Sequence, residues 1–559
     1  MKVQVLTAGI AAALLLAAAP HAGAQSRVVI NNVDIDGEGL NDPTPAQPTS
    51  SNPGKTLGEQ RRLVFQYAAD LWGALLDSEV PIKVNGSFAP LQCDDDGVTL
   101  GQSRSASRKR NFPNAPQQDI DYPVAQASAY AGTDLANGGP HIELWFSSAV
   151  DTSSCQEDQG ARGWHYGLLG NDDNETNGAN FLNVALHEIA HGLGVSGSLS
   201  TSIYDTLAWS NQDGVTINAL AGTGDFDALF AAITTPGNVV WTGELVNATG
   251  GLLAENRESL VVTSPAPARY EYAAATFGNP DTAAFTGTEL VLLRDAEATE
   301  DQAPGGSLAC AGANDSTTGK PFPPLGNAEA LAGKVALLDR GGCEFGLKAL
   351  NAQNAGAVAV VIANNEDDLA LSPGPGAVGD QVTVPVLLVA SSSGQALRGD
   401  AAVMLAGIQP DPDRFYGLDD DGRVRLYAPS TFQGGSTYSH VDTDMQPNAL
   451  MEPAETSSLN SHIFMDVALD MFEDTGWSTN RDGTAKIGEC DTGIPMVREG
   501  SFIPGANLVA QQGMCTTAAG GSRSRYVSCM NDHALKLRDV GVLTNSEVAR
   551  VRSCVAKMR

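Results

Sequence analysis

The chain has 559 residues and carries 65 acidic against 33 basic side chains, a formal net charge of −32 at pH 7. A field of this sign repels phosphate backbones, so nucleic acid and anionic membrane surfaces are excluded as expected partners. The length predicts roughly two to four domains of ~100–200 residues each.

The chain begins with the features of a secretory signal peptide. Lys2 is followed by the apolar run AGIAAALLLAAA and by the small-residue cleavage signal Ala22-Gly23-Ala24. This run is too short and wrongly flanked for a membrane-spanning helix. We expect cleavage after Ala24, and because no later apolar run reaches about 18 residues, we expect a soluble protein that is secreted or periplasmic.

Eight cysteines lie after the signal segment, which suits an oxidising compartment. None belongs to a CxxC pair, so a cysteine-ligated zinc site is disfavoured. Pairing within local clusters is the simplest proposal, although spacing does not fix connectivity. The clusters are Cys93 with Cys155, Cys310 with Cys343, and Cys490, Cys515, Cys529 and Cys554.

The first elements alternate between strand and helix. A helix is predicted over 56–78, because Thr56 and Glu59 form a capping box and apolar residues recur at helical spacing. The segments around it are predicted as a β-like segment at 27–35, a strand at 80–88, a loop-rich stretch at 98–140 and a strand at 141–148.

The pattern of the sequence changes near residue 250, where strand-like apolar runs begin to alternate with helical segments. A strand at 333–342, a helix at 343–356 and a strand at 357–365 predict a βαβ-like unit, followed by a strand at 384–390 and a helix at 391–399. The glycines do not form a phosphate-binding loop, because the GxxxxGK[ST] pattern is absent.

From about residue 410 the chain is again acidic and rich in loops. A helix with apolar residues at helical spacing is predicted from Ile463 to Phe472, ending at 473–477. The last seventy residues contain four cysteines and a helix opened by the capping box of Thr544 and Glu547, which predicts a small disulfide-supported appendage.

The stretch HEIAH, residues 187–191, is a candidate metal site on a helix predicted over about 181–193. Histidines four residues apart share one helix face, so His187 and His191 can bind one ion with Glu188 beside them. Zinc lowers the pKa of a water ligand towards ~7, and a neighbouring carboxylate can then take its proton. The alternative interpretation is a surface helix in which the motif occurs by chance and has no metal-binding role.

A catalytic zinc site has three protein ligands and one open position. The widespread HExxHxxGxxH pattern would supply the third histidine at position 197, but Gly197 stands there. Lone histidines usually find only local hydrogen bonds, so the residues alone leave several candidates open. These candidates are His141, His165, His440, His462 and His533.

Three segments together resemble the leishmanolysin family of metzincin metalloproteases: HEIAHGLG at 187–194, SHVDTDMQPNALMEP at 439–453 and DVALDMFEDTGW at 466–477. In that family an insertion displaces the third zinc histidine to a place shortly before an N-x-L-M-x-P Met-turn. The resemblance covers about 27–245 and 410–480 and is strongest at the first two segments.

This resemblance implies the roles of five residues. His187, His191 and His440 would bind one zinc ion, Glu188 would be the general base, and Met451 would form the floor beneath the metal. Gly194 matches the family glycine that lets the chain turn after the helix.

The separation of 249 positions from His191 to His440 is far longer than the family's usual insertion. Within that gap, 335–365 and 384–397 resemble a protease-associated (PA) domain, a module inserted in several secreted peptidases. The resemblance implies an insertion at about 255–408 that gates the cleft or helps to select substrates. It also places Cys310 and Cys343 in one module, consistent with a local disulfide.

The expected fold class is therefore α+β: a zincin-like, metzincin-type catalytic domain interrupted by a β-rich α/β PA domain and followed by a small cysteine-containing region. The expected domains are the signal peptide 1–24, the first part of the metalloprotease domain 25–250, the PA domain 255–408, the second part of the metalloprotease domain 410–485, and the C-terminal region 486–559.

Two minor features have alternative interpretations. Cys93 could act as an inhibitory thiol, but a disulfide with Cys155 is favoured in an oxidising compartment. The acidic clusters at 34–42, 93–97 and 417–422 are candidates for calcium, but none matches a complete EF-hand loop, which favours solvated turns.

The first functional hypothesis is a secreted, zinc-dependent endopeptidase that hydrolyses extracellular proteins with a metal-activated water. The alternative is a non-catalytic secreted binding or adhesion protein with a structural metal and a partner-binding PA domain. Glu188 argues against the alternative, since a structural site has no use for an unliganded carboxylate beside its first histidine. A zinc hydrolase acting on a non-peptide bond also remains open, because HExxH does not specify the bond.

Overall fold

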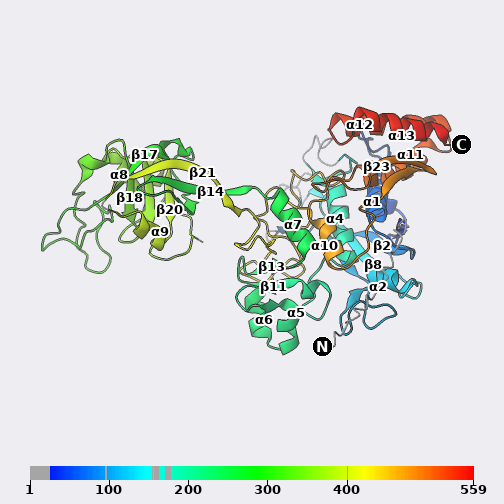
Figure 1. Cartoon of the computed structure of the whole chain (residues 1–559), viewed down its shortest axis with the longest axis horizontal. Helices are drawn as coiled ribbons and strands as arrows, with labels where there is room; N and C mark the ends of the chain where they lie inside the picture. The colour runs from blue at the N-terminus through cyan, green and yellow to red at the C-terminus, as the bar shows by residue number, and fades with distance from the viewer. Residues whose placement is uncertain are drawn as a thin grey trace, which may run out of the picture. The chain divides into compact units, whose positions relative to one another are not determined.

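The computed structural model describes residues 25–94, 97–153, 155, 163–169, 178–369, 371–399 and 401–558. The chain divides into two compact units (Figure 1): unit 1 is Met1–Ala254 with Gly417–Arg559, and unit 2 is Glu255–Tyr416. Unit 2 is one continuous segment that interrupts unit 1, and the expected insertion at 255–408 lies within it. The expected signal peptide lies outside the described residues.

A four-stranded sheet forms the framework of unit 1, in the order β1-β2-β8-β5. β1 pairs parallel with β2 and β2 parallel with β8, whereas β5 pairs antiparallel with β8 and forms an edge. Buried and half-buried residues alternate along β8, as expected for a strand with one face on a core. The strands are β1 (Val28–Asn32), β2 (Ile82–Ala89), β8 (Ile142–Ser147) and β5 (Gly101–Ser105).

Two helices pack together in this part of unit 1. α1 (Leu57–Leu75) begins at Thr56, whose side chain accepts a hydrogen bond from the backbone N–H of Glu59 at 3.1 Å. α4 (Phe181–Leu193) contacts α1, β5 and β8. The indole N–H of Trp72 in α1 donates to the carbonyl of Leu186 in α4 at 3.0 Å, so the packing of the two helices includes a buried polar link.

The stretch 98–140 differs from the loop-rich expectation, because it contains β5 and the helix α2 (Val124–Ala131). The residues of β5, GQSRS, carry no apolar alternation, and an edge strand with half-buried and exposed residues does not need one. The remaining short strands before α4 are β3 (Cys93–Asp94), β4 (Gly97–Val98), β6 (Arg108–Lys109), β7 (Tyr122–Pro123), β9 (Trp164–His165) and β10 (Ala179–Asn180).

A second, smaller sheet follows α4 in unit 1, in the order β12-β11-β13. Its strands are β11 (Ala208–Ser210), β12 (Val215–Thr216) and β13 (Val239–Trp241), and the nearby helices are α5 (Ile217–Thr223), α6 (Phe226–Ile233), α7 (Glu244–Leu253) and α10 (Ala468–Asp474). The predicted helix over Ile463–Phe472 begins later than expected, at Ala468.

The C-terminal region has more helix than the sequence predicted. The hairpin of β22 (Thr484–Ile487) and β23 (Cys490–Pro495) is followed by α11 (Pro504–Ala519), α12 (Arg523–Asp539) and α13 (Asn545–Lys557). The capping box of Thr544 and Glu547 opens α13 as predicted. α11 packs on α1, so this region belongs to unit 1.

Unit 2 is built on an eight-stranded mixed sheet in the order β15-β14-β21-β17-β18-β19-β20-β16. The four strands β17 to β20 run parallel, and β18, α8 and β19 form the predicted βαβ unit. Its elements are β14 (Asn256–Ser264), β15 (Ala268–Tyr270), β16 (Tyr272–Ala274), β17 (Thr286–Leu292), β18 (Val335–Asp339), α8 (Phe345–Asn354), β19 (Ala359–Ala363), β20 (Val386–Val389), α9 (Ser391–Ala396) and β21 (Val403–Phe415).

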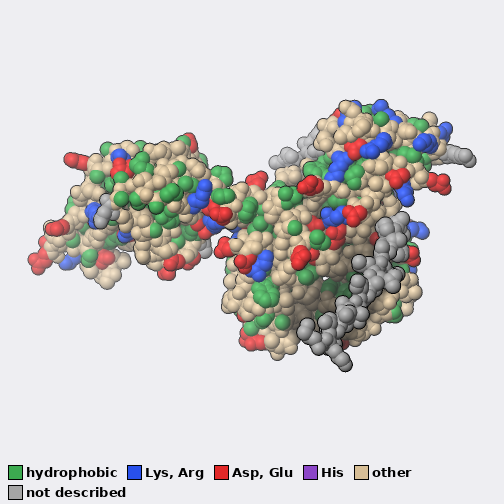
Figure 2. All heavy atoms as spheres, viewed as in Figure 1, with side chains coloured by type: hydrophobic (Ala, Val, Ile, Leu, Met, Phe, Trp, Pro, Cys, Tyr) green, Lys and Arg blue, Asp and Glu red, His purple; other side chains and the backbone are tan. Residues whose placement is uncertain are grey.

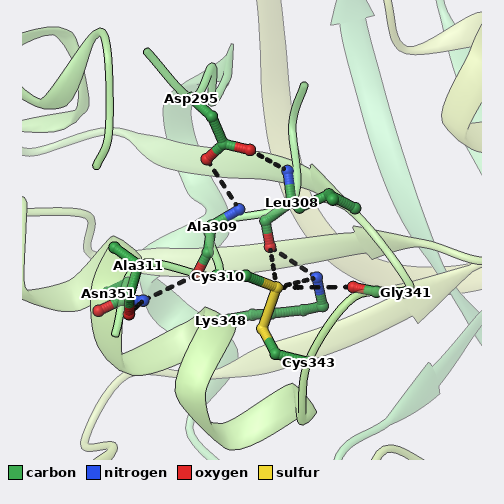
Figure 3. The surroundings of a disulfide bond; sticks show 9 residues. All are labelled: Asp295, Leu308, Ala309, Cys310, Ala311, Gly341, Cys343, Lys348 and Asn351. Atoms are coloured by element: carbon green, nitrogen blue, oxygen red, sulfur yellow. Dashed lines mark hydrogen bonds between the residues drawn. A yellow bond between two sulfur atoms is a disulfide. The ribbon is translucent and has the colours of Figure 1, made fainter. Parts of the chain in front are cut away.

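A buried lysine ties α8 to a disulfide-bonded loop of unit 2 (Figure 3). The Lys348 side chain is fully buried, and its Nζ donates to the carbonyl of Leu308 at 2.6 Å and lies 3.3 Å from the Sγ of Cys310. Cys310 forms a disulfide with Cys343. Asp295 accepts hydrogen bonds from the backbone N–H groups of Leu308 and Ala309, at 3.0 and 3.1 Å. The loop is therefore fixed by hydrogen bonds to both Lys348 and Asp295.

The surface of both units carries charges of both signs. Acidic and basic side chains are both scattered over the visible face in Figure 2. Among the described residues, no helix is both long and apolar enough to cross a membrane.

Candidate metal centre

α4 presents the two histidines of the HExxH motif. The side chain of Asn180 caps the helix by accepting the backbone N–H groups of Leu182 and Asn183, at 3.1 and 3.3 Å. The helix ends at Gly194, whose φ of 129° is a conformation that other residues rarely adopt. His187 and His191 are one turn apart between these two ends and so share a helix face.

His440 joins His187 and His191, although it lies 249 positions after His191 in the sequence. The Nε2 atom of His440 lies 3.1 Å from that of His187 and 3.0 Å from that of His191. His191 and His440 are buried, and His187 is partly exposed. Among the described residues, these three histidines form the one group of potential ligands whose atoms lie close enough together to hold a metal ion.

Each of these imidazoles is fixed by a hydrogen bond through its other nitrogen. The Nδ1 atoms of His187, His191 and His440 lie 2.7, 2.5 and 2.9 Å from the carbonyl oxygens of Leu450, Val195 and Ser436. A carbonyl can only accept, so each Nδ1 carries the proton and donates it. Each Nε2 is therefore left with a lone pair that points into the cluster.

This donor set fits a zinc ion. Imidazole nitrogens ~2.0–2.1 Å from a tetrahedral ion lie about 3.3 Å apart, close to the separations found here. Three lone pairs at such distances repel one another unless a cation lies between them. Burial lowers the pKa of His187 to about 4 and that of His440 to about 3, and burial together with the two neighbouring imidazoles holds the pKa of His191 well below its ordinary value. All three rings are thus neutral at neutral pH, as metal ligands must be.

Glu188 is a buried carboxylate beside the cluster. Its side chain belongs to a residue that is 5% exposed, and burial raises its pKa to about 8. Its Oε2 has no hydrogen-bond partner among the described residues. Gly101 of β5 lies so close that a Cβ there would be 2.6 Å from Oε1 of Glu188. With its pKa at about 8, the Glu188 side chain is mostly protonated at neutral pH, and a cation held by the three imidazoles would favour its ionised form. Its free oxygen is then placed to exchange protons with a bound molecule.

The loop after His440 is tied back to the site. Met451 is fully buried, and its carbonyl accepts the backbone N–H of Val441 at 2.8 Å. The N–H of Leu450 donates to Oδ2 of Asp466 at 2.7 Å, while the carbonyl of Leu450 accepts from His187. Sequence reasoning did not single out Asp466, because a buried carboxylate that binds backbone has no local sequence signal.

The three histidines line a cleft of about 610 Å³. One wall contains β5 and Trp145, over whose ring the Arg104 guanidinium lies 5.4 Å from the centroid. The rest of the lining includes Asn183 and Val184 of α4, the segment 434–436 and residues of 450–459.

The other candidate histidines lie outside this cluster. The Nδ1 of His141 accepts the backbone N–H of Lys83 at 3.2 Å, and the Nε2 of His533 lies 2.5 Å from Oδ1 of Asn507. His165 is buried in β9, and His462 is buried with its carbonyl accepting from Asn507. The structure thus brings His440 alone of the five to His187 and His191.

All eight cysteines form disulfides within the clusters seen in the sequence. The pairs are Cys93–Cys155, Cys310–Cys343, Cys490–Cys554 and Cys515–Cys529. Cys93 is therefore bonded to Cys155 rather than free, and the inhibitory-thiol interpretation is wrong for this state of the chain.

The acidic clusters considered for calcium use their carboxylates locally. Asp34 accepts the backbone N–H of Leu40 at 2.7 Å, and Asp419 accepts that of Arg423 at 2.8 Å and also pairs with its guanidinium. Part of the cluster at 93–97 lies outside the described residues. Calcium binding at these turns stays a prediction.

Solved structures similar to this chain include the zinc aminopeptidase BSAP from Bacillus subtilis, with 22% sequence identity and a TM-score of 0.19. The match covers 30% of this chain and 37% of that chain. Another is a peptidase M28 precursor from Shewanella amazonensis, at 13% identity, 28% and 36% coverage and a TM-score of 0.18. Scores this low do not bear on the fold of unit 1.

Similar curated proteins differ in their named activities. Human ER degradation-enhancing alpha-mannosidase-like protein 3 is 32% identical over 149 residues, 25% of this chain and 16% of that protein. The probable lipoprotein aminopeptidase LpqL of Mycobacterium tuberculosis is 44% identical over 13% of this chain and 14% of its own length. The Arabidopsis thaliana vacuolar-sorting receptor 7 is 45% identical, with 11% of each covered. The chain thus spans less than a fifth of each relative.

Residues 289–397 match the family model described as the PA domain. This segment runs from β17 to α9 and includes the parallel strands of unit 2 and the Cys310–Cys343 disulfide. The predicted PA domain is therefore confirmed, and residues 289–397 of this chain are a PA domain.

Proposed function

We propose that this chain is a secreted, zinc-dependent endopeptidase of the leishmanolysin-like metzincin type, with a PA domain inserted between its second and third zinc ligands. His187, His191 and His440 hold one zinc ion, and Glu188 is the general base. The observation that carries the proposal is the convergence of three imidazoles, in which Nε2 of His440 lies 3.1 and 3.0 Å from those of His187 and His191, beside the buried Glu188 with one free oxygen.

A zinc ion bound by the three imidazoles would supply Lewis-acid chemistry, polarising a scissile carbonyl and lowering the pKa of a water molecule. Glu188 accepts a proton on its carboxylate and returns it to the leaving amine. Its burial and the backbone of Gly101 restrict the positions that the carboxylate can take, so little reorganisation is needed as the proton moves.

The edge strand β5 supplies a binding surface for a peptide. One edge of β5 pairs with β8, and β5 also lines the cleft with the histidines. An extended peptide can add to a free sheet edge through backbone hydrogen bonds, which do not depend on the peptide's side chains. This mode of binding suits a protein substrate cut within its chain.

The catalytic assignment is tested by separating zinc binding from peptide cleavage. We expect Glu188→Ala to retain zinc and to lose cleavage of unfolded casein by roughly 10²–10⁴-fold, the range for loss of a general base. We expect His440→Ala to lose zinc, whereas His141→Gln, at a buried histidine outside the cluster, keeps it. Full zinc occupancy in His440→Ala would remove His440 from the ligand set.

A second experiment distinguishes an endopeptidase from an aminopeptidase. Peptides with an acetylated N-terminus lack the free amine on which an aminopeptidase acts, and we expect them to be cut internally at rates close to those of the free peptides. Cleavage restricted to free N-termini would contradict the endopeptidase assignment. Zinc-loaded protein that cuts no peptide of a broad library would instead favour the secreted binding protein with a structural metal.

The proposed export rests on the N-terminal apolar segment and the four disulfides. The PA domain is proposed to contact substrate, as its resemblance to the PA modules of secreted peptidases implies; among its described residues no cluster of metal-ligating side chains is found.

A further inference from the structure

His440 reaches the two helix histidines from a segment far along the chain, so something must fix its position relative to α4. The loop that follows α4, residues 195–206, contacts the segment 436–440. The N–H of Gly197 donates to Oγ of Ser439 at 3.1 Å, and the N–H of Leu199 donates to the hydroxyl of Tyr438 at 2.5 Å. The hydroxyl of Tyr204 donates to the carbonyl of Tyr438 at 2.8 Å.

Asp205 lies at the centre of this loop, in the short 3₁₀ helix Tyr204–Thr206, and is fully buried. Its Oδ1 accepts the Tyr438 hydroxyl at 2.8 Å and the N–H of Ser198 at 3.1 Å. Its Oδ2 accepts the hydroxyls of Ser198 and Ser202. No lysine or arginine in the described ranges pairs with it, so a buried carboxylate is solvated here by neutral donors of one loop and one tyrosine.

We infer that Asp205 is a positioning residue for the third metal ligand, acting through Tyr438. The carboxylate orders the loop after the helix, and the same carboxylate holds the Tyr438 hydroxyl two residues before His440. The bonds of Tyr438 at both its hydroxyl and its carbonyl fix the backbone that leads into His440. This inference rests on the ligand set proposed above.

A group that hydrogen-bonds a metal ligand directly is worth about 10–100-fold in metal affinity, and Asp205 acts one step further away, through Tyr438, so its effect should lie towards the lower end of that range. Without the Asp205–Tyr438 bond, the segment 436–440 gains conformations in which His440 points away from the two helix histidines, and the zinc ion must then select the competent one. The expected result is weaker zinc binding and an altered ligand geometry, even where the protein stays folded.

The test measures metal binding rather than activity. Tyr438→Phe removes the hydroxyl but keeps the ring, and Asp205→Asn keeps the size of the side chain and removes its charge. We expect each full-length variant to bind zinc about 10-fold more weakly in competition with a chromophoric chelator. We also expect a changed visible absorption spectrum when cobalt(II) replaces zinc, because that spectrum reports ligand geometry. The double variant should bind zinc about as weakly as Asp205→Asn alone, since the Tyr438 hydroxyl acts through its hydrogen bond to Asp205.

Thr544→Ala is the control, because it removes the cap of α13 in the C-terminal region and so lowers stability without touching the proposed ligands. We expect it to leave zinc affinity and the cobalt spectrum unchanged. If Asp205→Asn does not fold, the Tyr438→Phe variant alone tests the inference. Unchanged affinity and spectrum in Tyr438→Phe would overturn the inference, whereas unchanged affinity in His440→Ala would instead overturn the proposed ligand set.

Discussion

The ring of Tyr438 fills the space that a side chain at position 197 would need. A Cβ built on Gly197 would lie 2.3 Å from the ring carbon Cζ of Tyr438, far inside van der Waals contact. Position 197 is where the HExxHxxGxxH pattern has its third histidine. The glycine and the distant third histidine are therefore linked, because the segment that carries His440 passes over the α-carbon of Gly197.

Restoring the consensus histidine should harm the protein. We expect Gly197→His to displace Tyr438 and with it His440, lowering zinc affinity instead of adding a ligand. Gly197→Ala should also lower zinc affinity, through its Cβ alone. Calorimetry measures the change in stability, and zinc competition measures the change in affinity. Gly222→Ala is the matched control, because nothing lies within 4 Å of a Cβ there and alanine favours a helix interior. Tighter zinc binding in Gly197→His would contradict this account.

A methyl group on the edge strand should disturb the general base without disturbing the metal. In Gly101→Ala the new Cβ would meet Oε1 of Glu188 at 2.6 Å. Because a small misplacement of a catalytic group can cost about 10²-fold in rate, we expect peptide cleavage to fall by roughly that factor. Zinc content should stay at one ion per chain. Gly251→Ala, at an open position in α7, should change neither quantity.

The sequence predicted those elements whose side chains carry a strong periodic or capping signal. The α1 helix was predicted at 56–78 and found at Leu57–Leu75, because Thr56 caps it and one face is apolar. The βαβ unit around α8 was predicted for similar reasons. The edge strand β5 was missed, since a half-exposed strand of small and polar residues shows no alternation. The helices α11 and α12 were also missed; α11 has only a weak apolar face, and α12 is polar on average.

The candidate site was predictable only in part from the residues themselves. Spacing placed His187 and His191 on one helix face with Glu188 beside them, but five other histidines stayed open until a family resemblance selected His440. Asp205 and Tyr438 are 233 residues apart, and their contact leaves no trace in the local sequence. Contacts of this kind depend on how the chain returns after unit 2, and local patterns do not contain that information.

Buried Lys348 should make the stability of unit 2 depend on pH. Burial lowers the pKa of its ammonium from 10.5 to about 8 in the folded state, although Asp295 and Asp339 oppose the shift. Between about pH 8 and 10.5 the unfolded chain binds more protons than the folded one, so the free energy of unfolding rises with pH in that window. The rise between pH 7 and 9.5 is on the order of 2 kcal/mol.

Thermal unfolding at pH 7 and pH 9.5 measures this dependence in the full chain. Lys348→Met has no group that titrates at this position, so the pH dependence of the unfolding temperature of unit 2 should flatten. Lys334→Met is the matched control, because the Lys334 ammonium is partly exposed beside Glu289 and should leave the slope as it was. Equal slopes in the wild type and Lys348→Met would exclude the buried ammonium as the cause.

Removal of the metal should loosen unit 1 and leave unit 2 unchanged. The three proposed ligands all belong to unit 1, and His440 comes from the part that follows unit 2. A ligand that binds only the folded state stabilises it by about 2.7 kcal/mol at a concentration of one hundred times its Kd. Chelation should therefore increase amide hydrogen exchange most in 436–453 and in the loop 195–206. Exchange in β18 and β19 of the PA domain serves as the internal control and should not change. An equal increase of hydrogen exchange in both units, or no increase in 436–453, would show that the metal is not bound by these three imidazoles.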